Sequence, residues 1–93
     1  MTDTQTIERT ETVSRTMPMF KVLLHNDDVN DFLHVIRAVY EVFKFEHQKV
    51  VEIVMEAHET GVALCAVEPK ELAEHHCEQL MSFSLTATIE PEG

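Results

Sequence analysis

The sequence predicts a small α+β domain, a two-layer sandwich in which a three-stranded antiparallel sheet carries its helices on one face, in the order β-α-α-β-α-β. Three observations lead to this prediction. The chain has 93 residues, which is room for one core. Hydrophobic residues make up 44% of it, including five Phe and five Met, which is enough to fill that core. Short apolar runs also alternate with longer segments of helical periodicity.

The three strands are predicted from short apolar runs. Residues 19–25 are apolar and β-prone, and the run stops at a turn-forming Asn-Asp-Asp sequence. Residues 62–67 are a second run of small apolar side chains. From 83 to 89, apolar residues alternate with Ser and Thr, the period-two pattern of a strand with one wet face. Pro69 suits the first turn of a helix between the last two strands, whose apolar side chains fall within 72–80.

Two amphipathic helices are predicted between the first two strands. Apolar residues in 32–43 recur at intervals of three and four, which places them on one helical face. Asn30 or Asp31 can cap its N-terminus. A second stripe covers 50–58 and stops at Gly61, which readily adopts the left-handed conformation that ends helices. The two helices are expected to form a hairpin.

The chain is expected to divide into a flexible N-terminal tail, residues 1–18, and a core domain, residues 19–93. The tail is rich in threonine and charge, with only scattered apolar residues, so it has no face to bury. No run approaches the roughly 18 apolar residues of a membrane span, and the N-terminus lacks the order of a signal peptide. A cytoplasmic protein with no membrane partner is therefore expected.

Charge narrows the classes of partner. Seventeen acidic residues against seven basic ones give a formal net charge of -10. The negative electrostatic potential that this charge produces opposes binding to nucleic acid and to anionic lipid. It favours cationic ligands, and a free peptide N-terminus is a cation at neutral pH.

Cysteine and histidine invite two chemical hypotheses, and neither is favoured. Cys65 and Cys77 show no CxxC spacing and are expected to be reduced thiols. A Cys65–His58 nucleophile pair would lack a recognisable oxyanion loop, so an enzyme is not expected. A zinc site is not expected either, because neighbouring helical residues point about 100° apart. The residues considered for zinc are His47, Cys65, His75, His76 and Cys77. No cofactor is predicted.

Two polar features remain open to two interpretations. Residues 26–31 hold an Asn/Asp cluster directly after the first strand, which is either a capping loop or part of a site. His58 lies on the apolar stripe of the second helix, where a histidine is commonly a boundary residue and sometimes a ligand-binding one.

Longer strings of the sequence resemble a known family. FKVLLHNDDVNDFLHVIRAVYEVF, VVEIVMEAHETGVALCAV, AEHHCEQ and SLTATIEPE, between about Met19 and Glu90, resemble the ClpS family of Clp protease adaptors. The most telling parts are the Asn-Asp-Asp after the first strand and the Ala-His-x-x-Gly that closes the second helix.

The resemblance implies a function and a site. ClpS adaptors bind substrates that bear a bulky hydrophobic N-terminal residue, an N-degron, and deliver them to a Clp-type AAA+ protease. The implied partners are therefore N-degron substrate proteins and the N-terminal domain of a ClpA or ClpC type unfoldase, which would also engage the tail. Asn26, Asp27 and His58 match the residues around the substrate's α-amino group. Asp28 and Asn30 match loop and backbone contacts. The side-chain pocket is matched by Val29, Phe32, Val54, Ala57 and Leu85.

The chain departs from the family pattern at the mouth of the implied pocket. Family members usually carry Thr-Pro-Met where this chain has Asn30, Asp31 and Phe32, and Val54 replaces a methionine. The segment before the last strand is also several residues shorter. These departures motivate an alternative, a regulator that docks on the Clp unfoldase without N-degron capture. The fold of the ribosomal stalk protein's C-terminal domain and a small metal-binding protein are further alternatives.

Overall fold

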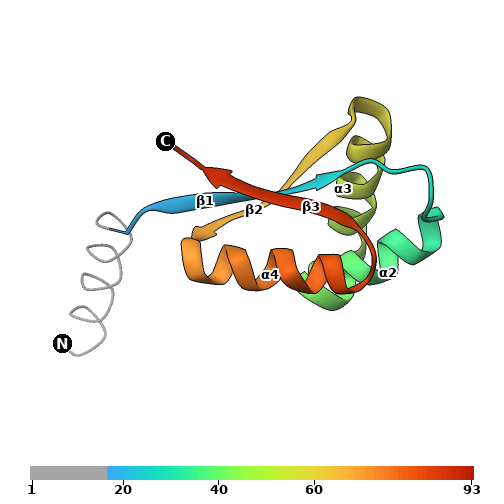
Figure 1. Cartoon of the computed structure of the whole chain (residues 1–93). Helices are drawn as coiled ribbons and strands as arrows, with labels where there is room; N and C mark the ends of the chain where they lie inside the picture. The colour runs from blue at the N-terminus through green and yellow to red at the C-terminus, as the bar shows by residue number, and fades with distance from the viewer. Residues whose placement is uncertain (1–16) are drawn as a thin grey trace.

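A computed structural model of the chain describes residues 17–93 (Figure 1). The tail expected at 1–18 therefore lies outside the described residues, apart from Met17 and Pro18. The element order confirms the predicted α+β fold. The elements are β1 (Met19–His25), α2 (Phe32–Phe43), α3 (His47–Thr60), β2 (Val62–Pro69), α4 (Lys70–Ser82) and β3 (Thr86–Pro91).

The sheet has the strand order β2-β1-β3, and both pairings are antiparallel. In Figure 1, α4 runs beneath the sheet, and α2 and α3 lie at the end where β1 stops. The register of β1 and β2 shifts between Val22 and Leu23, which places one extra residue, Cys65, in β2. The side chains that the strands bury between sheet and helices are Val22, Leu24, Ala63, Cys65 and Ala87.

Local signals in the sequence account for the ends of the first two helices. Of the two N-cap candidates for α2, the structure has Asp31, whose carboxylate accepts the N–H of His34 at 2.9 Å. α3 begins at His47, before its apolar stripe. It ends at Gly61, where φ is 95° and the N–H donates to the carbonyl of Ala57 at 2.9 Å.

The last strand begins later than predicted, at Thr86 rather than at residue 83. Residues 83–85 instead close α4 in a Schellman motif, because Ser84 adopts φ 68°. The N–H of Ser84 donates to the carbonyl of Met81 at 2.9 Å, and that of Leu85 to the carbonyl of Leu80 at 3.2 Å. The apolar alternation at 83–85 thus reflects a turn that buries Leu85. β2 is longer than predicted, and Pro69 precedes α4 instead of entering its first turn.

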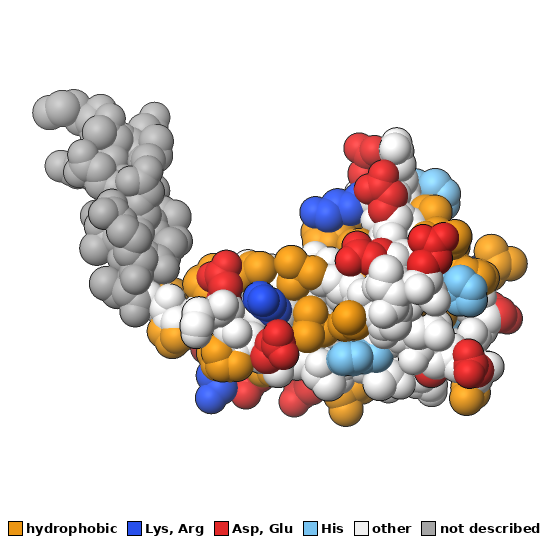
Figure 2. All heavy atoms as spheres, turned by 90° about the horizontal axis from the view of Figure 1, so that it is seen from above, with side chains coloured by type: hydrophobic (Ala, Val, Ile, Leu, Met, Phe, Trp, Pro, Cys, Tyr) orange, Lys and Arg blue, Asp and Glu red, His pale blue; other side chains and the backbone are white. Residues whose placement is uncertain are grey.

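None of the helices described between residues 17 and 93 covers the opposite face of the sheet (Figure 1). Figure 2 views the molecule from this side, where hydrophobic side chains are interspersed with charged ones. The exposed apolar residues of β2 are Val62, Leu64 and Val67. Within residues 17–93, no helix is long and apolar enough to cross a membrane.

Candidate functional site

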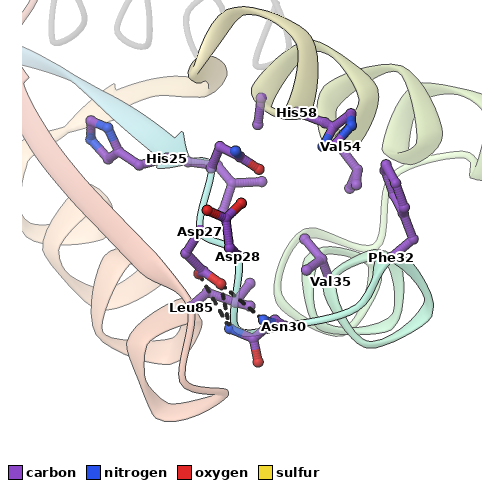
Figure 3. A pocket seen from close by; sticks show the side chains of 12 residues that line it. His25, Asp27, Asp28, Asn30, Phe32, Val35, Val54, His58 and Leu85 are labelled. Atoms are coloured by element: carbon purple, nitrogen blue, oxygen red, sulfur yellow. Dashed lines mark hydrogen bonds between the residues drawn. The ribbon is translucent and has the colours of Figure 1, made fainter.

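One backbone hydrogen bond joins the two segments that the sequence singled out. The N–H of Asn26, at the start of the loop after β1, donates to the carbonyl of Gly61 at 3.0 Å. Gly61 terminates α3, so the bond fixes the loop beside the last turn of that helix, which carries His58. Segments more than thirty residues apart in sequence therefore face each other across one cavity (Figure 3).

The cavity has a volume of about 210 Å³. It brings together nine of the ten residues that the resemblance implicated, and it adds three that the sequence had not indicated as site residues. The lining consists of Leu24, His25, Asn26, Asp27, Asp28, Asn30, Phe32, Val35, Val54, Ala57, His58 and Leu85. Of the added residues, Val35 had a detectable signal, because it lies one helical turn after Phe32 on the same face of α2.

The inner wall of the cavity is apolar and its mouth is polar. Val54, Ala57 and Leu85 are buried, and they come from α3 and from the turn after α4. Phe32 is 41% exposed. Its ring meets the His58 imidazole nearly edge-on, with centroids 4.9 Å apart and an interplanar angle of 62°. Figure 3 shows both rings on the same side of the cavity, opposite the loop carboxylates.

Val29 does not lie where the resemblance placed it. Its side chain is 91% exposed and is absent from the cavity lining. The cause is the turn made by the loop. The Asp27 Oδ1 accepts the N–H groups of Val29 at 3.1 Å and of Asn30 at 3.0 Å, which leaves the Val29 side chain in solvent.

Asp27 is the most hydrogen-bonded carboxylate of the site. Besides the two backbone N–H groups, it accepts the Asn30 side-chain amide, at 3.1 Å on Oδ1 and 3.2 Å on Oδ2. These donors stabilise the charged form, with the backbone N–H of Asn30 contributing most, and lower the pKa of Asp27 from its ordinary value. In Figure 3 the Asp27 carboxylate is turned to Asn30, whereas that of Asp28 has no drawn partner.

The two cysteines lie apart from this arrangement, as do His47, His75 and His76. Burial, with the nearby charge of Glu68, raises the pKa of Cys65 to about 12, so it carries no thiolate at neutral pH and is unsuited to nucleophilic chemistry. His76 pairs instead with Glu68, with Nδ1 and Oε1 2.7 Å apart. Within the described part of the chain, no three His, Cys, Asp or Glu side chains are grouped to hold a metal ion.

Fold and site together define a small α+β binding domain whose apolar cavity opens at a carboxylate-bearing loop. Comparison with known proteins identifies the family of this domain. The family model described as ATP-dependent Clp protease adaptor protein ClpS matches residues 15–88. The chain belongs to the ClpS family.

Individual relatives agree with this assignment. The chain is 43% identical over 83 residues to the ATP-dependent Clp protease adapter protein ClpS of Synechococcus sp. (strain CC9902), covering 88% of this chain and 80% of that relative. It is 40% identical over 90 residues to the ClpS of Gloeobacter violaceus (strain ATCC 29082 / PCC 7421), which covers 96% of this chain and 97% of that relative. Among solved structures, it is similar to Agrobacterium tumefaciens ClpS2 bound to L-phenylalaninamide. That match has a TM-score of 0.77 and 28% identity, and covers 81% of this chain and 98% of that chain.

Proposed function

We propose that this protein is an adaptor that binds substrates by a bulky hydrophobic N-terminal residue and delivers them to a Clp-type AAA+ protease. One observation carries the proposal: a buried apolar wall and a polar, acidic mouth share a single cavity of about 210 Å³. The L-phenylalaninamide held by the Agrobacterium relative has a free α-amino group beside an aromatic side chain. Those two groups suit the mouth and the wall respectively.

The mouth suits an α-ammonium group by its chemistry. An ammonium has three donors and a positive charge, and the loop and α3 supply an amide oxygen at Asn26, a carboxylate at Asp27 and an imidazole at His58. The overall charge of -10 favours approach of the cation. Asp28 adds a second carboxylate to the lining of the cavity.

The wall suits a large apolar side chain. Val54, Ala57 and Leu85 expose no polar side-chain atom to the cavity, so a Phe, Tyr, Trp or Leu side chain would gain about 25 cal/mol for each Å² withdrawn from water, before the costs of binding. A Lys or Asp side chain would bring a charge to a wall that offers it no partner. Asn30 and Phe32, which depart from the family pattern, still line a formed cavity. This favours a protein that binds N-terminal residues over a regulator that has no binding site for them.

A set of peptides that differ only in the first residue tests capture. Peptides beginning with Phe, Tyr, Trp or Leu are expected to bind, and those beginning with Asp, Lys or Gly are not, as measured by fluorescence anisotropy. An N-acetylated Phe peptide serves as the control for the amine and should bind weakly. Equal binding of all first residues would reject capture and favour the regulator.

Delivery is the second half of the proposal, with the N-terminal domain of a ClpA or ClpC type unfoldase as the partner. The cavity is built from residues 24–85, so deletion of residues 1–16 is expected to leave peptide affinity unchanged and to slow degradation of a Phe-initiated substrate by the protease. Loss of peptide affinity in the truncated protein would show instead that the tail belongs to the binding site.

A further inference from the structure

The turn between α4 and β3 presents two backbone carbonyls to the binding loop. The Asn30 Nδ2 donates to the carbonyl of Ser84 at 2.8 Å. The His34 Nε2 lies 2.7 Å from the carbonyl of Phe83, which has no hydrogen to give, so this nitrogen is the donor. The turn is a rigid partner, because the Schellman hydrogen bonds of Ser84 and Leu85 fix its backbone.

Asn30 connects this turn to the carboxylate at the mouth. One hydrogen of its amide nitrogen serves the Ser84 carbonyl, and the other serves Asp27, with Nδ2 3.1 Å from Oδ1 and 3.2 Å from Oδ2. The amide nitrogen is therefore fully used within the protein. Figure 3 shows it between the loop and the turn, with the amide oxygen on the side away from Asp27.

We propose that Asn30 is a positioning residue for recognition of the substrate's α-amino group: it ties the Asp27 carboxylate to the fixed carbonyl of Ser84. This inference rests on the proposed function. The Asp27 Oδ1 takes three donors, from the N–H groups of Val29 and Asn30 and from the Asn30 amide. Oδ2 takes the longer amide contact, and the Thr86 side chain also donates to this carboxylate. A carboxylate offers about four lone-pair sites on its two oxygens, so Oδ2 retains acceptor capacity for an ammonium.

The chemistry of the residue explains why asparagine fits this position. A primary amide carries two hydrogens on one nitrogen and can bridge two acceptors, whereas a threonine hydroxyl has one. An aspartate at position 30 would have the same shape but no donor, and would set a second negative charge against Asp27. The role differs from the direct substrate contact that the sequence resemblance implied for Asn30.

The experiment compares two peptides on several variants. One peptide begins with Phe and has a free amine, and the other is its des-amino analogue, in which a hydrogen replaces the α-amino group. Their affinity ratio measures the contribution of the amine alone. Asn30→Ala is expected to reduce this ratio about tenfold, the size of one well-made hydrogen bond to a charged group, and to leave des-amino binding unchanged. Asn30→Asp is expected to reduce it further.

His34→Ala is the matched control, because it removes a hydrogen bond to the same turn without touching Asp27. It should keep the amine ratio of the wild type. Thermal unfolding of each variant checks that the domain is folded. A second readout is the pKa of Asp27, followed by carboxyl NMR. It should rise in Asn30→Ala, because the donors that lower it include the Asn30 amide.

The results can reject the positioning role of Asn30 without rejecting the capture of N-terminal residues by the wild type. If Asn30→Ala weakens both peptides equally, Asn30 contacts the substrate directly and the positioning role is wrong. An unchanged amine ratio in Asn30→Ala, or an equal loss in His34→Ala, also overturns it while wild-type capture stands. If the wild type itself fails to distinguish the free amine from its des-amino analogue, the proposed function fails.

Discussion

The ring of Phe32 meets the imidazole of His58 edge-on, with centroids 4.9 Å apart, so the first residue of α2 touches the residue of α3 that faces the binding loop. Edge-to-face contacts of this kind contribute about 0.5–1.5 kcal/mol beyond the area that they bury. Phe32 therefore has two effects. It narrows the mouth of the cavity, and it restricts the orientation of His58.

Replacement of Phe32 should change which first residues the cavity accepts. In Phe32→Ala, the mouth loses a ring, so a Trp-initiated peptide is expected to gain affinity relative to a Leu-initiated one. Absolute affinity for both should fall, because His58 loses its aromatic neighbour. Anisotropy titrations with the two peptides measure the ratio. Tyr40→Ala is the matched control, since Tyr40 lies on the same helix, is 46% exposed and does not line the cavity. A similar shift of the ratio in both variants would contradict a role for Phe32 at the mouth.

His58 should give peptide binding its dependence on pH at the acid side. A neutral imidazole can accept a hydrogen bond from an ammonium, whereas a protonated one repels it. Affinity for a Phe-initiated peptide is therefore expected to fall as pH drops from about 8 to 5. His58→Ala should bind the peptide about tenfold more weakly at neutral pH. Its affinity should also fall less steeply on the acid side of the pH profile, here called the acid limb.

Two comparisons assign that acid limb to His58. The pKa of Asp27 lies below its ordinary value, so this carboxylate stays charged throughout the interval. His25 also lines the cavity, but its Nε2 lies 2.7 Å from the Thr88 hydroxyl, and Figure 3 shows its ring turned away. His25→Ala should keep the acid limb. An acid limb that persists in His58→Ala would exclude His58 as the acceptor.

The lowered pKa of Asp27 also predicts how stability depends on pH. A carboxyl whose pKa is lower in the folded than in the unfolded state stabilises the fold above its unfolded value, about 3.9. That contribution is lost as pH falls through the folded-state pKa. Asp27→Asn should therefore be less stable than the wild type at pH 7, and the difference should vanish in strong acid. Urea unfolding at pH 7 and in strong acid measures the difference in the free energy of unfolding. Asp28→Asn is the control, and an equal effect there would point to net charge instead.

Periodicity predicted most of the fold, because each long element had a consistent pattern. β1 and α2 have the predicted bounds, and Gly61 ends α3 as expected. The error at residues 83–85 has a specific cause. Ser84 adopts a positive φ that usually favours glycine, so the turn carried no sequence signal. The apolar residues on either side of it then imitated the alternation of a strand.

The site was harder to predict than the fold. No sequence pattern joins Asn26 to Gly61, because the hydrogen bond between them depends on how β1 and β2 pair. Only resemblance to the ClpS family connected the loop with His58. The same resemblance misplaced Val29, since it could not include the turn that Asp27 makes with its own backbone. It also could not show that the Asn30 amide donates its hydrogen bonds to Asp27 and to the Ser84 carbonyl.

Gly61 should prove important for both stability and binding. Its φ of 95° is strained for any residue with a Cβ, although, apart from the adjoining backbone, no atom lies within 4 Å of where that Cβ would be. Gly61→Ala is therefore expected to destabilise the domain by about 1–2 kcal/mol through backbone strain alone. Relief of the strain would rotate the peptide whose carbonyl receives the Asn26 N–H, so affinity for a Phe-initiated peptide should also fall.

Two further substitutions test whether backbone conformation is the cause. Gly93→Ala makes the same chemical change at a site with no positive φ and should alter neither stability nor binding. Ser84→Gly makes the reverse change where φ is 68°. It should leave stability unchanged or raise it by up to about 1 kcal/mol, because relief of the strain offsets the added freedom of the unfolded chain. Urea unfolding and anisotropy on the same samples give both quantities. If Gly61→Ala lost stability but kept full affinity, the bond from Asn26 to Gly61 would not be what holds the loop against α3.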